Sequence, residues 1–281
     1  MKIIILIEND LSCDPNLVNE FGFSVFIQDE DTSLIFDTGQ SGIFIKNIEK
    51  LKLDTKNIHT IVLSHNHYDH VGGLKNYIEK FGNNFTLYLN KNFFDKRFSF
   101  SELYSRILGA NFFQDYILDK KINLSFINEH IHILSKNITA FTNFERLNDF
   151  EEINLSYYKK KNSTFILDSM SDEIVLGLDT KLGFFILCGC SHIGIVNIIK
   201  NIKKWTNKKI VGIIGGLHLS KSNSERILKT INYLKKEDIK YLALSHCTGK
   251  NIIKIFKDSG FNILPTNTGI LPTNTGNVLE F

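Results

Sequence analysis

Three histidines and one aspartate lie within six residues of this sequence, at His65, His67, Asp69 and His70. In extended backbone, side chains two residues apart project to the same side, so His65 and His67 can reach one cation together. If the chain turns into a helix near His70, Asp69 and His70 swing toward a second point nearby. Imidazole and carboxylate groups suit Zn²⁺, Fe or Mn²⁺, whereas Ca²⁺ prefers oxygen ligands only. The motif therefore predicts a metal site, with zinc favoured over iron or manganese.

Two glycines, Gly72 and Gly73, follow this motif directly. Because glycine has no Cβ, we expect the backbone here to pass close to the metals without a clash. Ligand-type residues at these offsets arise by chance in on the order of one chain in a thousand or fewer. A metal site is therefore favoured over a group of unrelated core or surface histidines.

Further histidines lie where strands are expected to end. The carboxyl ends of strands are where open α/β folds gather their sites. Three histidines do not share this placement and are expected to be structural or surface residues: His59, His130 and His132. The six candidates at strand ends or adjoining turns are His65, His67, His70, His192, His218 and His246.

The first part of the chain alternates short apolar runs with turns, a pattern that predicts strands at 3–7, 23–28 and 32–37. Apolar residues at helical spacing predict a helix over 42–53. A continuous apolar run at 60–64 leads into the motif, and such a run is typical of a strand covered on both faces.

The later part of the chain repeats this alternation of strands and helices. The pattern predicts a hairpin of strands at 173–179 and 183–189, a helix at 193–205, a strand at 209–216, a helix at 224–236 and a strand at 241–245. Alternation in both halves predicts an α/β (α+β) protein in which two sheets lie between helices, in four αββα layers.

Residues 91–161 have a different texture, with aromatic-rich turns and short strand-like runs at 122–128, 131–135 and 138–144. No Pro/Gly linker flanks this region. We therefore expect one domain over 1–281, with a core made of 1–90 and 162–281. Residues 91–161 are expected to form an insertion or cap near the active face.

The composition excludes several classes of protein. Hydrophobic residues make up 43% and charged residues 22%, which favours a well-filled core over disorder. The net charge of +3 is mild and the basic and acidic residues are interspersed, so no nucleic-acid partner is expected.

Neither a membrane span nor a signal peptide is expected. No apolar stretch approaches the ~18 residues that cross a membrane, and the first apolar run ends at Glu8, too soon for a signal peptide. The four cysteines are Cys13, Cys188, Cys190 and Cys247, and their spacing forms no disulfide framework. We therefore expect a reduced, cytoplasmic protein.

Several sequence blocks resemble a known family. The HxHxDH motif after a buried strand, the preceding LIFDTG (34–39) and a late histidine closing a strand are marks of the metallo-β-lactamase superfamily. LSHNHYDHVGGL (63–74), GCSHIGIVN (189–197), IGGLHLS (214–220) and SHCTG (245–249) further resemble the subfamily named for 7,8-dihydropterin-6-yl-methyl-4-(β-D-ribofuranosyl)aminobenzene 5′-phosphate synthase.

This resemblance implies the four-layer αββα metallo-β-lactamase fold and a centre of two divalent metal ions. By the same resemblance, His65 and His67 bind one metal, whereas Asp69, His70 and His246 bind the other. Asp37 is implied to brace the site through hydrogen bonds without binding a metal.

The sequence departs from the family pattern at two ligand positions. The usual histidine that opens the hairpin is absent, and residues 168–172 stand at the matching place. The usual bridging aspartate is replaced by a segment that contains Cys188, Cys190 and His192. His192 is our first choice for the missing ligand because imidazole binds without deprotonation at neutral pH, and Cys190 and Asp168 are the alternatives. Cys188 is expected to be a buried small hydrophobe.

The implied function is that of a metal-dependent hydrolase that uses a metal-bound hydroxide on a small (phospho)ester-type metabolite. Asp69 would orient the water and accept a proton. His218 would either protonate a leaving group, bind a substrate phosphate or carboxylate, or be structural. The alternative is the subfamily's named reaction, transfer of a dihydropterin-methyl group from its diphosphate to a ribofuranosylaminobenzene phosphate.

Two other functions are disfavoured. Nucleic-acid processing requires a basic face, and the basic runs are only 159–161 and 203–204. A di-iron redox protein requires an electron donor, and no flavin domain is attached. The oligomeric state is left open. The segment ILPTNTG occurs at 263–269 and again at 270–276, which we interpret as a local tandem duplication.

Overall fold

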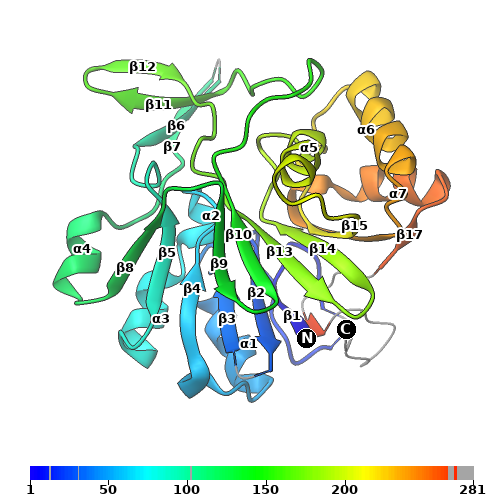
Figure 1. Ribbon diagram of the computed structural model, residues 1–281. Coiled ribbons are helices and arrows are strands. Elements are labelled where there is room, and N and C mark those ends of the chain that lie inside the picture. The colour runs from blue at the N-terminus through cyan, green and yellow to red at the C-terminus, as the bar shows by residue number, and fades with distance from the viewer. Residues whose placement is uncertain (13, 31, 102, 265–268, 271–281) are drawn as a thin grey trace.

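The computed structural model describes residues 1–264 except 13, 31 and 102, together with residues 269 and 270. Two seven-stranded sheets face each other, and helices lie on their outer sides (Figure 1). The predicted α/β (α+β) class is therefore confirmed. Cys13 and most of the duplicated ILPTNTG segment lie outside the described residues.

The first sheet is antiparallel at one side and parallel from β3 onward, so β3, β4, β5 and β8 all end at the same edge. The helices α1 (Ile43–Lys50) and α3 (Leu74–Phe81) accompany it. In spatial order, its strands are β18 (Gly269–Ile270), β1 (Lys2–Ile7), β2 (Ser24–Asp29), β3 (Thr32–Phe36), β4 (Ile58–Val62), β5 (Thr86–Asn90) and β8 (Asn123–Ile127).

The second sheet contains the predicted hairpin, in which β13 pairs antiparallel with β14 and Thr180 lies opposite Gly183. The predicted helix at 224–236 coincides with α6 (Ser224–Lys236), and α5 (Ile195–Thr206) and α7 (Lys250–Asp258) lie on the same side. In spatial order, its strands are β17 (Asn262–Ile263), β16 (Tyr241–Leu244), β15 (Ile210–Gly215), β14 (Gly183–Cys188), β13 (Val175–Thr180), β10 (Ile138–Phe141) and β9 (Ile131–Ser135).

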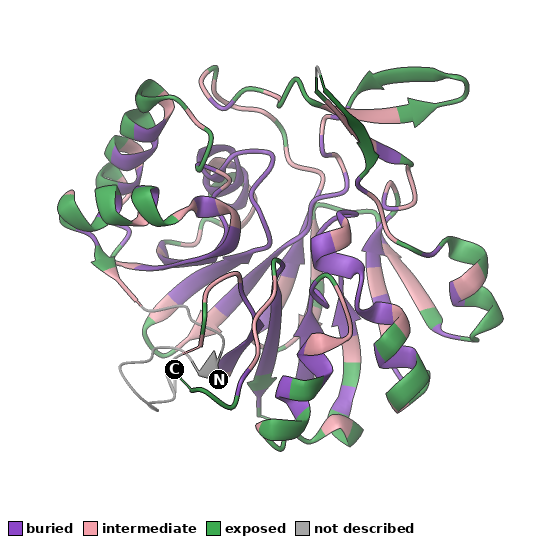
Figure 2. Cartoon of the chain, turned by 180° about the vertical axis from the view of Figure 1, so that it is seen from behind, coloured by how far each residue is buried: buried purple, intermediate pink, exposed green. Residues whose placement is uncertain are grey.

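Three apolar clusters show why four layers form. One joins strands of the first sheet to α1 and α3, for example Leu63 with Phe44 and Leu74. A second joins the second sheet to α5, α6 and α7. The third lies between the sheets and includes Phe36 and Leu187. Figure 2 shows the result, with buried central strands and helices that are exposed on their outer faces.

The expected bounds of the cap are wrong. Within 91–161, β8 extends the first sheet and β9 and β10 extend the second, so this stretch completes the core sheets. A separate four-stranded sheet, which we call the accessory sheet, has the order β12 (Thr164–Leu167), β11 (Tyr157–Lys161), β6 (Arg97–Phe100) and β7 (Ser105–Ile107). Short strand-like runs do not show which sheet a strand joins, because that depends on hydrogen-bonded neighbours far away in the chain.

The remaining helical segments are α2 (Tyr68–Val71) in the motif, α4 (Gln114–Asp119) before β8, and the short turns η1 (Thr55–Asn57) and η2 (His246–Thr248). None of the helices in the described part of the chain is long and apolar enough to cross a membrane.

Candidate metal centre

The motif begins where β4 ends and turns into α2, as the sequence predicts. His67 is the last extended residue, with φ −117° and ψ 139°, and it immediately precedes α2. His65 Nε2 lies 3.1 Å from His67 Nδ1, so these two side chains do meet on one side. The turn places Asp69 and His70 on α2, where they face a second group of side chains.

Two buried groups of possible metal ligands result. One consists of His65, Cys190 and His192, and the other of His70, Cys190 and His246. Within each group the candidate ligand atoms all lie within 4.8 Å of one another. Cys190 therefore stands between the groups, and its Sγ lies 3.2 Å from His70 Nε2. The preference for His192 over Cys190 stays a prediction, and the structure brings both side chains to the same place.

Asp69 lies beside the second group. Its Oδ2 is 3.3 Å from His246 Nε2 and 3.9 Å from His70 Nε2. Burial alone would raise the pKa of Asp69, but its contact with His246 and the nearby imidazoles lower it below its usual value. Asp69 is therefore a carboxylate at neutral pH, in the form that binds a cation.

Carboxylate, hydroxyl and amide oxygens hold three of the candidate ligand imidazoles in one orientation. His70 Nδ1 donates to Asp37 Oδ2 at 2.7 Å, and Ser64 Oγ also donates to that oxygen. His65 Nδ1 lies 2.8 Å from Ser64 Oγ. His246 Nδ1 donates to Asn9 Oδ1 at 2.9 Å. In all three histidines, Nδ1 has a partner, so Nε2 is directed toward the centre. Outer hydrogen bonds of this kind are typical of metal-binding histidines.

Backbone donors fix the two loops that carry the later ligands. Glu173 accepts hydrogen bonds from the backbone N–H groups of His192 and Ile193, both at 2.8 Å. Glu8 accepts from the His246 N–H at 2.7 Å. Burial raises the pKa of Glu173 to about 7 and also raises that of Glu8. These two carboxylates position the ligand loops and do not point their oxygens at the cluster.

The residues present fit divalent metal ions. His67 Nε2 and His192 Nε2 are buried and have no hydrogen-bond partner among the described residues, although an unpaired buried polar atom is costly. Burial lowers the pKa of His65 and His192 well below its usual value, so both are neutral imidazoles. Mixed nitrogen, thiolate and carboxylate donors suit zinc or iron. Burial raises the pKa of the Cys190 thiol, so a cation is needed to make it a thiolate.

Left-handed backbone conformations gather around the centre. Asp37 has φ 62°, Ser191 φ 59°, His218 φ 50° and His246 φ 51°. Such conformations cost side-chain-bearing residues free energy and persist where the surrounding structure over-determines them. The hydrogen bonds of Asp37 and His246 described above are part of that surrounding structure.

Gly72 and Gly73 are required for a different reason from the one expected. A Cβ on Gly72 would lie 2.1 Å from the carbonyl oxygen of Gln40, and a Cβ on Gly73 would lie 2.3 Å from that of Thr38. The two glycines let α2 pack against the backbone of the loop after β3, and this packing holds the motif in place.

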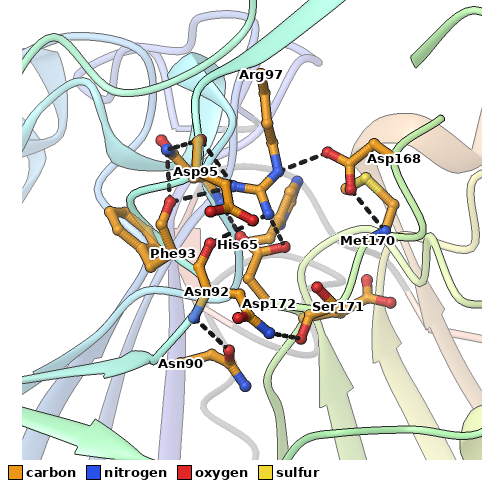
Figure 3. A network of polar contacts seen from close by, with 12 residues as sticks. His65, Asn90, Asn92, Phe93, Asp95, Arg97, Asp168, Met170, Ser171 and Asp172 are labelled. Atoms are coloured by element: carbon orange, nitrogen blue, oxygen red, sulfur yellow. Dashed lines mark hydrogen bonds and ion pairs between the residues drawn. The ribbon is translucent and has the colours of Figure 1, made fainter. Parts of the chain in front are cut away.

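Asp168, the third alternative for the missing ligand, belongs to neither ligand group. Its Oδ2 lies 2.8 Å from Arg97 Nε, and Arg97 NH2 lies 2.8 Å from Asp172 Oδ1 (Figure 3). Asp172 in turn accepts a hydrogen bond at 2.8 Å from the backbone N–H of Asn66, between the first two motif histidines. The expectation of Asp168 as a ligand is not supported, because its carboxylate is an ion-pair partner in this network.

His218 lies at the rim of the centre. Its ring centroid is 4.3 Å from that of His192, and its Nε2 is 3.5 Å from the hydroxyl of Tyr157. Tyr157 is the first residue of β11 and its ring also packs edge-on against His67. Burial lowers the pKa of His218 to about 4. The accessory sheet therefore contributes a side chain to the site.

The open side of the centre is shown by the ligands that keep some exposure. His65 and His70 are fully buried, whereas His67, Asp69, His192 and His246 retain 5–8% of their surface. Tyr157 and His218 stand beside two of these partly exposed residues, His67 and His192. His59, His130 and His132 lie elsewhere; His130 stacks on Trp205 and His132 packs near Tyr88.

Sequence reasoning missed the residues that support the ligands, among them Glu8, Asn9, Arg97 and Glu173. Most of them are polar residues within otherwise ordinary segments. A buried charge directly after an apolar strand, as at Glu8, was the one available signal.

Comparisons with known proteins agree with this geometry. A sequence profile described as the metallo-beta-lactamase superfamily matches residues 18–132. The chain is 29% identical over 280 residues to the 7,8-dihydropterin-6-methyl-4-(β-D-ribofuranosyl)-aminobenzene-5′-phosphate synthase of Methanocaldococcus jannaschii, covering 92% of this chain and 91% of that protein.

Solved structures with the same fold are also found. Tm1679, a metal-dependent hydrolase of the β-lactamase superfamily, is 28% identical with a TM-score of 0.84, over 98% of this chain and 100% of that one. Zn²⁺-bound PqqB from Methylobacterium extorquens shares the fold, with 11% identity and a TM-score of 0.55 over the full length of both chains. The chain thus has the metallo-β-lactamase fold, and its sequence is similar to that superfamily.

Proposed function

We propose that this protein is a metal-dependent hydrolase of a small phosphoester- or ester-type metabolite. The observation that carries the proposal is the pair of ligand groups that share Cys190. In this proposal His65, His67 and His192 would hold one divalent ion, and Asp69, His70 and His246 would hold the other. Cys190, which both ligand groups share, would help to hold both ions, in the place where the family usually has aspartate. Zinc is the first choice, with iron and manganese as alternatives.

Bound divalent ions would supply Lewis-acid chemistry and lower the pKa of a coordinated water toward neutrality. The chain's own residues do the rest. Asp69 is held as a carboxylate beside His246, where it orients a water and takes up its proton. Tyr157 and His218 face the open side and contact the departing part of the substrate. A donor there acts on the leaving group, and the hydroxyl of Tyr157, whose pKa is raised by burial, keeps its proton at neutral pH.

The metal ions and the hydrolysis are tested together in protein purified without added metal. Elemental analysis is expected to give close to two zinc, iron or manganese ions per chain, and a panel of phosphoesters, esters and thioesters is expected to contain a hydrolysed class. His65→Ala is expected to lose metal and activity while keeping the circular dichroism spectrum, because His65 sits in a strand-end loop. A metal-free wild-type protein with unchanged hydrolysis would contradict the proposal.

The second candidate is transfer of a pterin-methyl group, favoured by 29% identity over nearly the whole length of the Methanocaldococcus jannaschii synthase. In that reaction, the centre would bind the diphosphate of the donor, and no water would attack. Incubation with the pterin diphosphate, with and without the ribofuranosylaminobenzene phosphate acceptor, distinguishes the transfer reaction from hydrolysis. Hydrolysed donor without coupled product favours the hydrolase, and coupled product favours the transferase.

A further inference from the structure

One face of the accessory sheet is turned toward the metal centre. Tyr157 of β11 lies directly opposite Ser99 of β6, and Ser99 lies directly opposite Arg106 of β7. Directly opposite residues of antiparallel strands project to the same face of a sheet, so these three side chains form one row. At one end of the row, the ring centroid of Tyr157 lies 5.4 Å from that of His67. The face that carries Arg106 is therefore the face that meets the centre.

Arg106, at the other end of the row, contacts the motif itself. Its Nη2 donates to the Tyr68 hydroxyl at 2.8 Å, and its guanidinium carbon lies 4.7 Å from the centroid of the Tyr68 ring. Tyr68 is the first residue of α2 and stands between the candidate ligands His67 and Asp69. The backbone N–H of Tyr68 also donates to the carbonyl of Leu108 at 2.7 Å, which fixes the end of β7 beside the motif. Direct contacts therefore hold Arg106 at the rim of the centre.

The neighbouring cations on this face already have carboxylate partners. Arg97 pairs with two buried carboxylates, and Lys159, directly opposite Arg97, pairs with Asp95 at 2.9 Å. In contrast, Arg106 forms no ion pair with any described residue, and its hydrogen-bond partner there is a neutral hydroxyl. A guanidinium has five N–H donors, so one such contact orients Arg106 and leaves donors for a ligand. Arg106 is exposed, so a ligand can reach it.

The spacing of the row sets the size of a ligand that would reach both ends. Neighbouring strands lie about 4.7–4.9 Å apart, so the Cα atoms of Tyr157 and Arg106, two strands apart, are separated by roughly 10 Å. Only Ser99, with its small hydroxymethyl side chain, stands between them in the row. A substrate whose reacting bond lies beside Tyr157 would thus reach Arg106 with a group some distance from that bond.

We propose that Arg106, oriented by Tyr68, binds a second oxyanion of the substrate, a phosphoryl or carboxylate group separate from the bond that is hydrolysed. This inference rests on the proposed function and deepens it, because it selects metabolites that carry an anionic group away from the ester. The planar fork of a guanidinium matches the oxygens of both groups, which the point charge of lysine does not. The charge of arginine is permanent, so the site is cationic at every physiological pH.

Phosphonates test this site without turnover, because their C–P bond is not an ester. Calorimetry on zinc-loaded protein compares each alkylphosphonate, from propyl to octyl, with the α,ω-bisphosphonate and the ω-carboxyalkylphosphonate of the same chain length. One phosphonate binds the metal ions, and the added group reaches Arg106 in the ligand of matching length. The wild-type protein is expected to bind that two-headed ligand about tenfold more tightly than its alkylphosphonate, since one charge-assisted hydrogen bond is gained.

Arg106→Gln is expected to abolish this tenfold gain and to leave the binding of the alkylphosphonates unchanged. Arg106→Lys is expected to recover only part of the gain, because an ammonium lacks the planar fork. Lys160→Gln is the matched control and is expected to keep the full gain. Lys160 is an exposed cation on β11, and its position three residues after Tyr157 directs its side chain to the opposite face of the accessory sheet.

The proposal is overturned if Arg106→Gln keeps the gain that Lys160→Gln shows. It is also overturned if no two-headed ligand binds the wild-type protein more tightly than its alkylphosphonate. An Arg106-dependent gain with either added group supports the proposal, and the group with the larger gain identifies the oxyanion as phosphoryl or carboxylate. A protein that shows this gain but hydrolyses nothing in the ester panel would refute the proposed hydrolase and leave the Arg106 site intact.

Discussion

Replacing Arg97 with leucine is expected to destabilise the protein strongly. Arg97 is fully buried and is the ion-pair partner of Asp168 and Asp172, which are themselves buried. Removing one partner of a buried ion pair costs about 3–5 kcal/mol, because the remaining charge is left without compensation. The guanidinium also donates to the backbone carbonyl of Phe93 at 3.1 Å, so the upper part of this range is expected.

That loss is large relative to the stability of a typical protein, which is about 5–15 kcal/mol. It corresponds to a fall in melting temperature of roughly 10 °C for a chain of this size. Metal affinity should fall as well, because Asp172 holds the backbone N–H of Asn66 between two motif histidines.

Urea unfolding of wild type and Arg97→Leu, each with and without metal, measures both effects. Arg106→Leu is the control, since Arg106 is exposed on the neighbouring strand β7 and hydrogen-bonds the Tyr68 hydroxyl, so its loss should change the unfolding free energy by about 1 kcal/mol or less. Adding Asp168→Asn and Asp172→Asn to Arg97→Leu removes the unpaired charges and should restore most of the lost stability. If Arg97→Leu is as stable as Arg106→Leu, or if the triple variant is less stable than the single one, the reasoning fails.

Three further predictions concern the centre and its support. Cys190→Ala is expected to lose both metal ions and His192→Ala only one, by elemental analysis, since only Cys190 belongs to both ligand groups; full metal content in either variant would contradict this assignment. Burial raises the pKa of Asp172 to about 6, whereas an aspartate in the unfolded chain has a pKa of about 3.9. Between these two pH values, the folded protein keeps a proton on Asp172 that the unfolded chain has lost. Stability therefore falls as the pH rises from about 4 to about 6, and the stability of Asp172→Asn relative to wild type should grow by up to about 3 kcal/mol over that window; a flat difference in urea titrations would refute it. Gly72→Ala is expected to cost about 1–3 kcal/mol or more, because its Cβ would meet the Gln40 carbonyl at 2.1 Å; an unchanged melting curve would show that this close contact is relieved at no cost.

The central elements could be predicted from the sequence because their patterns are local. The apolar run before His65 and the helical spacing over 224–236 each depend on neighbouring residues, and the structure has β4 and α6 in those places. The candidate ligand histidines could also be recognised from local patterns, because they lie at or soon after the ends of apolar runs. His192 and His246 follow β14 and β16 of the second sheet, and His65 follows β4 of the first sheet, so the ends of strands from both sheets bring the ligand groups together although their residues are far apart in the chain.

The supporting residues and the cap could not be predicted in this way. Arg97 and Asp172 are 75 residues apart, and no local pattern indicates that they pair. The short apolar runs of β8, β9 and β10 do not show which sheet they join, and only their hydrogen-bonded neighbours assign them to the core sheets. The sequence offers Asp168 as an alternative ligand because carboxylates bind metals. In the structure its carboxylate forms an ion pair with Arg97, which is far away in the chain.

The contacts of His246 with Glu8 and Asn9 span 238 and 237 residues of the chain. During synthesis from the N-terminus, the segment after β1 that carries these two partners emerges long before His246 does. The first ligand group is complete once His192 has left the ribosome, whereas the second needs a further stretch that ends at His246. The ligands of the two groups therefore leave the ribosome in a fixed order. Contacts of such high sequence separation are slow to form, which makes the closing of the chain around His246 a late step in maturation.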